Sequence, residues 1–244
     1  MRFCLLGIAY VASGLFGPAA SGQVSSTTAL AAGSPDQAMR LYSASTQAES
    51  RLRNGLEYVN PTPAYFVGNP FFISDLPQRG SVAYDGGYYE RVPLLYEQHQ
   101  DQVLLFDSIK NVKIQLISSR VAAFMLGKSQ FVRLEADSGR VLTPGFYEVL
   151  VAGPAQLLAR RVKRAEKSST GRELTGQYVV EDRFFVQRGH HYTEVAKLSQ
   201  VLSALPEQKL VLQKLARSRN LKFKTASREA ALVDLVRAYN DSPR

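Results

Sequence analysis

The sequence contains no tryptophan and a single cysteine among its 244 residues. That cysteine, Cys4, lies in an N-terminal segment that we expect to be removed. The mature protein therefore has no disulfide framework, no cysteine-rich metal site and no cysteine nucleophile. The patterns Gly-x-Ser-x-Gly, His-Glu-x-x-His and Gly-x-Gly-x-x-Gly are also absent, so no residue is marked as catalytic and no cofactor is implied.

The N-terminus has the features of a secretory signal peptide. Arg2 supplies a positive charge, residues 3–16 form an uncharged apolar run, and residues 17–22 are small. The alternative is a retained N-terminal anchor. No later stretch approaches the roughly 20 apolar residues of a membrane helix. We therefore expect export to the periplasm or the exterior, with a signal peptide at 1–22, a flexible leader at 23–35 and no transmembrane span in the mature chain.

The remaining composition, 45% hydrophobic and 21% charged, is typical of a globular protein. Short Tyr- and Val-rich runs bounded by turn residues follow one another from Gly80 to about Val195, and Asp85–Gly86–Gly87 predicts a hairpin turn. The connections are too short for helical crossovers. We therefore predict an α+β, mainly β fold, in which an antiparallel meander forms a curved sheet, a sandwich or an open barrel.

The last fifth of the chain changes to a helical period. Pro206 to Asn220 and a segment that opens after Thr225 or Ser227 each carry an apolar stripe. These stripes predict two amphipathic helices within a helical C-terminal part at about 197–240. We expect one domain over 36–240. Its first segment, Asp36 to Asn54, is compatible with either a helix or extended chain.

The net charge of +9 is concentrated in one region, since 155–224 contains 15 basic and 6 acidic residues. Its densest run comprises Arg160, Arg161, Lys163 and Arg164, followed by Lys167. We predict that this run starts a projecting hairpin closed by residues 168–176. The charges protect an edge strand from aggregation, or they bind an anionic envelope surface, lipid phosphate or acidic polysaccharide. Nucleic acid is the least favoured partner, because no recognition helix or stacking motif is identifiable.

Glu97, His99 and Asp101 alternate along the chain, so an extended segment would place all three on one face as a partial site for a divalent metal. The glutamines between them indicate instead a solvated turn between two strands. Both interpretations stay open at this point.

Several motifs together resemble a family of uncharacterised, signal-peptide-bearing proteins exported by Bacteroidetes-type bacteria. They include NGLEY at 54–58, GNPFF at 68–72, GSVAYDG at 80–86, YERVPLLY at 89–96 and NLKFK at 220–224. Relatives often carry Asp where Glu97 stands here. The resemblance implies an exported, β-rich protein with a helical tail, and it brings no activity, cofactor or catalytic residue.

Together these features favour a non-catalytic, envelope-associated binding or scaffolding module. Its expected partner is an anionic envelope component or another envelope protein. Two alternatives belong to other classes of protein. One is a carrier that encloses an apolar ligand in a curved sheet, and the other is a hydrolase whose site is assembled from distant residues.

Overall fold

The computed structural model describes residues 51–137, 139, 141–171 and 173–242. The described residues all belong to one compact unit. The predicted signal peptide and leader lie outside the described residues. So does most of the segment 36–54, whose end is helical at Arg51 and Leu52.

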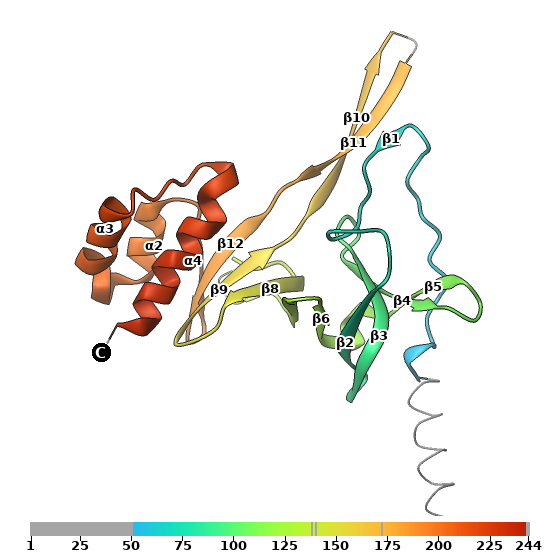
Figure 1. Ribbon diagram of the computed structural model, residues 1–244, viewed down its shortest axis with the longest axis horizontal. Helices are drawn as coiled ribbons and strands as arrows, with labels where there is room; N and C mark the ends of the chain where they lie inside the picture. Colours follow the sequence, from blue (N-terminus) through green and yellow to red (C-terminus); the bar gives the residue numbers. More distant parts are fainter. Residues whose placement is uncertain (1–50, 138, 140, 172, 243–244) are drawn as a thin grey trace, which may run out of the picture. The chain divides into compact units, whose positions relative to one another are not determined.

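Ten strands form one open antiparallel sheet (Figure 1). Its strands, in chain order, are β2 (Gln78–Tyr84), β3 (Gly87–Glu97), β4 (Gln102–Asp107), β5 (Val112–Gln115), β6 (Val121–Leu126), β7 (Ser129–Leu134), β8 (Gly145–Val151), β9 (Ala155–Arg160), β12 (Arg183–Arg188) and β13 (His191–Glu194). A second sheet has the order β1-β11-β10, with β1 at Phe66–Val67, β10 at Lys163–Thr170 and β11 at Glu173–Val180. The prediction of a mainly β, antiparallel fold followed by C-terminal helices is confirmed.

The large sheet consists of two meanders that share β2. Its order is β13-β12-β9-β8-β7-β6-β2-β3-β4-β5, so β6 pairs with the edge of β2 that β3 leaves free. A short 3-10 turn at Ser118–Arg120 leads the chain back to that edge. The predicted turn after β2 is confirmed, because Asp85 and Gly86 adopt φ of 49° and 76° between paired residues Tyr84 and Gly87.

Three α-helices follow the strands, rather than the two that were predicted. They are α2 (Leu198–Ala204), α3 (Lys209–Ser218) and α4 (Thr225–Asp241), and a 3-10 turn at Pro206–Gln208 precedes α3. The sequence pattern missed α2 because two turns buried mainly through Val201 and Leu202 give no repeated stripe. The side chain of Gln200 stabilises the start of α2 by accepting the backbone N–H groups of Ala196 and Lys197.

The helices pack on one face of β8, β9 and β12 (Figure 1). Successive side chains of a strand point to opposite faces of the sheet, so neighbouring residues belong to different hydrophobic clusters. Leu157 and Ala159 face the helices, whereas Leu158 joins a separate cluster with Tyr147 on the opposite face. None of the helices in the described part of the chain combines the length and apolar composition of a membrane span.

A third cluster packs aromatic rings together with aliphatic side chains among strands β2 to β8. Phe124 and Phe131 are stacked with ring centroids 4.6 Å apart, and the ring of Tyr96 lies 5.1 Å from that of Phe131. Phe146 closes the group with its centroid 5.2 Å from Phe124. All four side chains are at most 2% exposed, so rings occupy the interior on which the carrier alternative depends.

Candidate functional site

The strands β10 and β11 form the predicted hairpin, which continues the ribbon that β9 and β12 begin. Arg160 pairs with Arg183 in the large sheet, and Lys163 pairs with Val180 in the small one. The turn is narrower than predicted, because pairing extends to Thr170 and Glu173. Gly171 occupies the turn with φ of 63°, a conformation that glycine adopts without a side-chain clash.

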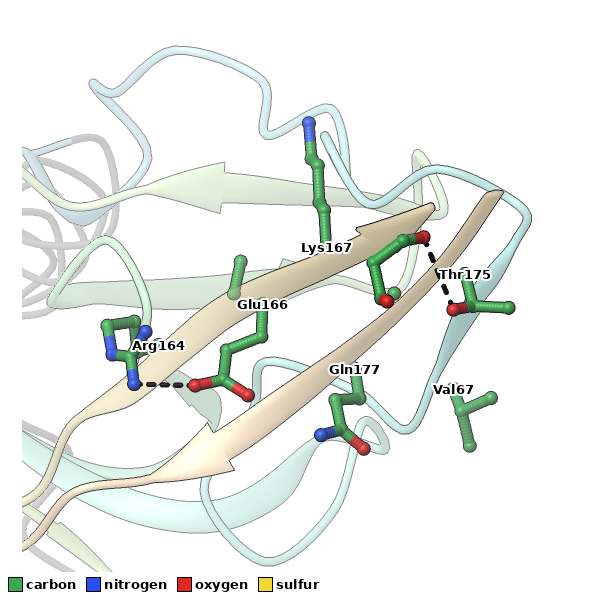
Figure 2. Close-up of a pocket in the computed structure, with 9 residues that line it drawn as sticks. Val67, Arg164, Glu166, Lys167, Thr175 and Gln177 are labelled. Atoms are coloured by element: carbon green, nitrogen blue, oxygen red, sulfur yellow. Dashed lines mark hydrogen bonds and ion pairs between the residues drawn. The ribbon is translucent and has the colours of Figure 1, made fainter. Parts of the chain in front are cut away.

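A groove of about 560 Å³ lies on the small sheet (Figure 2). Val67 of β1, Glu166 of β10 and Gln177 of β11 share its face, because β11 pairs with both other strands at these positions. Lys167 also lines the groove, although its side chain points away from Gln177 in Figure 2. Among the charged groups on the groove's face, Arg164 and Glu166 form an ion pair of 2.6 Å with each other. The groove can therefore offer hydrogen bonds, and of its three charged side chains Arg164 and Glu166 already neutralise each other.

Arg161 does not lie on the hairpin surface. It sits between β9 and β10 with its side chain only 10% exposed, and its guanidinium binds three carboxylates. Glu148 of β8 is 2.6 Å away, Glu229 of α4 is 2.7 Å away, and Asp182, between β11 and β12, completes the set. Burial lowers the pKa of Arg161, but the hydrogen bond to Glu229 and the charges of Glu148 and Asp182 raise it by more. This group, which we call the Arg161 cluster, joins the ribbon, the sheet and α4.

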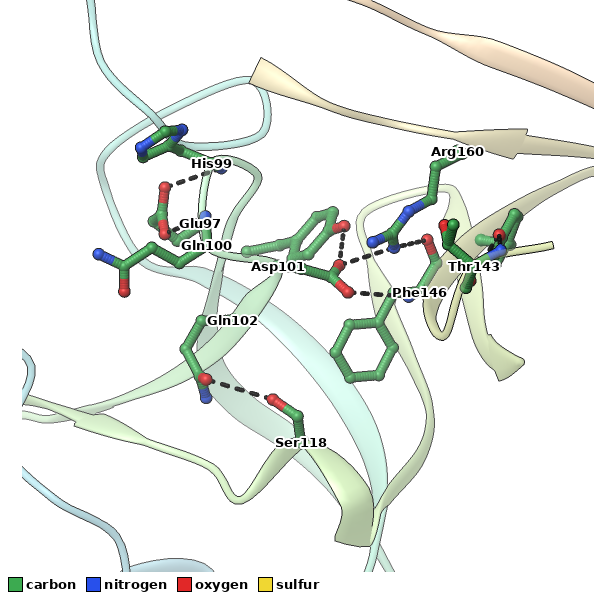
Figure 3. A network of polar contacts seen from close by, with 11 residues as sticks. Glu97, His99, Gln100, Asp101, Gln102, Ser118, Thr143, Phe146 and Arg160 are labelled. Carbon is green, nitrogen blue, oxygen red and sulfur yellow. Dashed lines mark hydrogen bonds and ion pairs between the residues drawn. The ribbon is translucent and has the colours of Figure 1, made fainter. Parts of the chain in front are cut away.

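Arg160 is likewise held by the interior of the protein (Figure 3). Its guanidinium lies 3.0 Å from Asp101 and donates to the carbonyl of Phe146 at 2.8 Å. Asp101 also accepts the hydroxyl of Tyr96 at 2.6 Å. Burial, with the nearby Asp101, raises the pKa of Tyr96 well above its usual range. The network therefore fixes the turn before β4 against β8.

The other predicted basic residues differ in their partners. Lys163 donates to the backbone carbonyls of Asn69 and Phe71, and burial lowers its pKa. Arg164 pairs with Glu166 and with Glu181. Lys167 is exposed and forms no ion pair with any described residue. Four of the five side chains proposed for anionic-surface binding thus have partners within the chain, and their role at such a surface stays a prediction.

The three metal candidates occupy the turn between β3 and β4, but they do not converge. Glu97 is 1% exposed and accepts the backbone N–H groups of His99 and Gln100, while Asp101 faces Arg160 and Tyr96 (Figure 3). The ring of His99 contacts the carbonyl of Lys163 through Nδ1 at 3.0 Å. Burial raises the pKa of Glu97. Within the described residues, no group of three acidic, His or Cys side chains is arranged around a metal position.

We expect zinc titrated into the protein to give no saturable heat in calorimetry. Both carboxylates would have to leave hydrogen bonds that shape the turn, and this cost opposes coordination. His99→Ala is the control, because it removes the imidazole and leaves both carboxylates in place. Saturable zinc binding that His99→Ala abolishes would contradict the prediction.

A second cationic region lies in the helical part. Residues 208–228 contain seven Lys and Arg and no Asp or Glu. Six of these cations are exposed, and only Arg219 forms an ion pair among the described residues, at 3.5 Å from Asp234. We call the exposed part of this segment the cationic helical face; its members are Lys209, Lys214, Arg217, Arg219, Lys222 and Lys224.

Two large apolar side chains interrupt this face. Leu210 is 80% and Val211 is 55% exposed, although the next residue, Leu212, is completely buried. This face belongs to the predicted charge excess at 155–224 but lies outside its densest run, at 160–164. The absence of acidic residues over 208–228, rather than the spacing of basic ones, is the signal that would have found this face.

Comparison with protein-family models, with curated proteins and with solved structures gives no match. The resemblance to exported Bacteroidetes-type proteins therefore stays a prediction.

Proposed function

We propose that the protein is an exported, non-catalytic binding module that attaches to an anionic surface of the cell envelope. The cationic helical face is the attachment surface. The observation that carries this proposal is the contrast between two groups of cations. Four of the five basic side chains at 160–167 have partners within the chain, whereas five of the six members of the cationic helical face form no ion pair with a described residue.

Unpaired, exposed cations retain their attraction for an external anion. The charge of a paired cation is already neutralised by its partner. Moving that cation to an external anion would leave the partner carboxylate unpaired. The α3 helix packs on α2 and α4 through the buried residues Leu212 and Ala216. This packing holds Lys209, Lys214 and Arg217 on a folded support, so they can meet an extended anionic surface together.

The two alternatives receive less support. A carrier needs an interior cavity, whereas buried rings pack against one another in the core that β2 to β8 share. A hydrolase needs converging acid, base or nucleophile groups, and the groove on the small sheet presents an ion pair, an amide and hydroxyl groups.

Removing three exposed cations from α3 should weaken binding to an anionic surface by about a hundredfold, since each cation near such a surface is worth about 1 kcal/mol. The variant is Lys209→Ala/Lys214→Ala/Arg217→Ala. Binding is measured by sedimentation with phosphatidylglycerol vesicles and with polygalacturonate-coated beads at rising salt. Binding of the unchanged protein should fall with salt, because counterions screen exposed charges.

The matched control is Arg79→Ala/Lys110→Ala/Lys128→Ala, which also removes one Arg and two Lys, all three exposed and in the strand part. It should lose much less binding. An equal loss in both triple variants would show that net charge alone drives attachment, and it would overturn the assignment to the helices. If the protein bound neither the vesicles nor the beads, the proposed function would be overturned.

A further inference from the structure

We propose that the surface which the cationic helical face binds is an anionic lipid bilayer, and that Leu210 and Val211 insert into its interfacial region. This inference rests on the proposed function and names its partner. It starts from the placement of two exposed apolar side chains among cations at one end of α3.

Helical geometry places these apolar side chains and the cations on one surface. Lys214 follows Leu210 by four residues and Arg217 follows it by seven, so all three share a stripe. Val211 lies beside that stripe, three residues before Lys214. The buried side chains Leu212 and Ala216 lie on the other side of the helix, in the core shared with α4. The outer surface of α3 therefore carries two apolar side chains near its N-terminal end, with Lys209 before them and Lys214 and Arg217 after them.

This combination distinguishes a bilayer from other anionic partners. A lipid surface rewards both features, because headgroup phosphates attract the cations while the acyl boundary accepts apolar side chains about 5–10 Å deep. An acidic polysaccharide is hydrated along its length and rewards only the charge. An exposed leucine alone would require no explanation, but here Leu210 and Val211 are adjacent and no acidic side chain occurs within 208–228 to repel phosphate.

The protein's lack of tryptophan makes insertion directly measurable. Leu210→Trp places a single fluorophore at the expected point of entry, and Ile109→Trp places one at an equally exposed site in the strand part, where Ile109 is 81% exposed. On addition of phosphatidylglycerol vesicles, the emission of Leu210→Trp should shift to shorter wavelength and be quenched by brominated acyl chains. The emission of Ile109→Trp should do neither.

A second variant separates insertion from electrostatic attraction. Leu210→Gln/Val211→Gln keeps every charge and replaces exposed side chains that contribute little to the core. Glutamine is a good helix former, so the variant should preserve α3. Its affinity for phosphatidylglycerol vesicles should fall about tenfold, while its binding to polygalacturonate beads should not change.

The possible outcomes distinguish the two proposals. Vesicle binding without a spectral shift at Leu210→Trp, or with full affinity in the double glutamine variant, would overturn insertion and leave the anionic-surface function intact. Binding to the beads alone would overturn the choice of lipid. If the protein bound neither vesicles nor beads, the proposed function itself would be overturned.

Discussion

Arg161→Ala should destabilise the protein by about 3–5 kcal/mol, because it leaves buried carboxylates without the cation that pairs with them. Glu148 is the most affected group: its side chain is 8% exposed and receives both Nε and Nη2 of Arg161. The loss also disconnects α4 from the ribbon, since Glu229 contacts the same guanidinium. Urea unfolding measured by circular dichroism gives the change in free energy.

Two comparisons test the reason for this loss. Arg164→Ala removes an arginine that also has two carboxylate partners, but its side chain is 51% exposed. Solvent screens those pairs, so the loss of stability should be much smaller than that caused by Arg161→Ala. Adding Glu148→Gln to Arg161→Ala should recover part of the lost stability, because the stranded charge is then gone. A loss from Arg161→Ala no larger than that from Arg164→Ala would contradict a buried, structural role for the Arg161 cluster.

Phe131→Ala should cost about 3–5 kcal/mol, the usual penalty for removing a fully buried ring. Phe131 is 0% exposed and stacks on Phe124, and the rings of Tyr96 and Phe72 each lie 5.1 Å from it. The truncation therefore opens a cavity among rings that cannot all collapse into it. Tyr88→Ala provides the control, because Tyr88 is 63% exposed and its loss should cost well under about 1 kcal/mol.

The same variant bears on the carrier alternative. A dry apolar cavity created by truncation can accept benzene, so benzene should raise the melting temperature of Phe131→Ala and leave that of the unchanged protein where it was. Stabilisation of the unchanged protein by benzene would instead reveal an interior space and favour a carrier.

Much of the fold could be predicted because local signals and tertiary packing agree. Strands β3 to β13 lie within the region from Gly80 to about Val195 that was predicted to form strands, and Asn220 adopts φ of 49° after α3, as its tolerance for a left-handed cap suggests. Sheet order could not be predicted in the same way. Nothing in the pattern of β5 or β6 shows that β6 pairs with β2, since this pairing joins residues far apart in the chain.

The candidate site was harder to predict because a charged side chain does not reveal its partner. The run at 160–164 is the densest basic feature of the sequence, yet Glu148, Asp182 and Glu229, which lie outside it, neutralise Arg161. The partners of the carboxylates at 97–101 are likewise not visible in the sequence. The carboxylates of Glu97 and Asp101 form hydrogen bonds to backbone and side-chain donors that only the folded chain brings together.

The unequal distribution of charge would govern how the protein approaches the anionic surface that we propose as its partner. Residues 196–242 contain nine basic and four acidic residues, and three of those four carboxylates, Glu207, Glu229 and Asp234, form ion pairs. Such separation gives a molecule a permanent dipole moment. The electric field of a negatively charged surface exerts a torque on this dipole, which turns the helices toward the surface before contact. Productive collisions would then be selected by orientation at long range, and raising the ionic strength would slow association before it weakened the final complex.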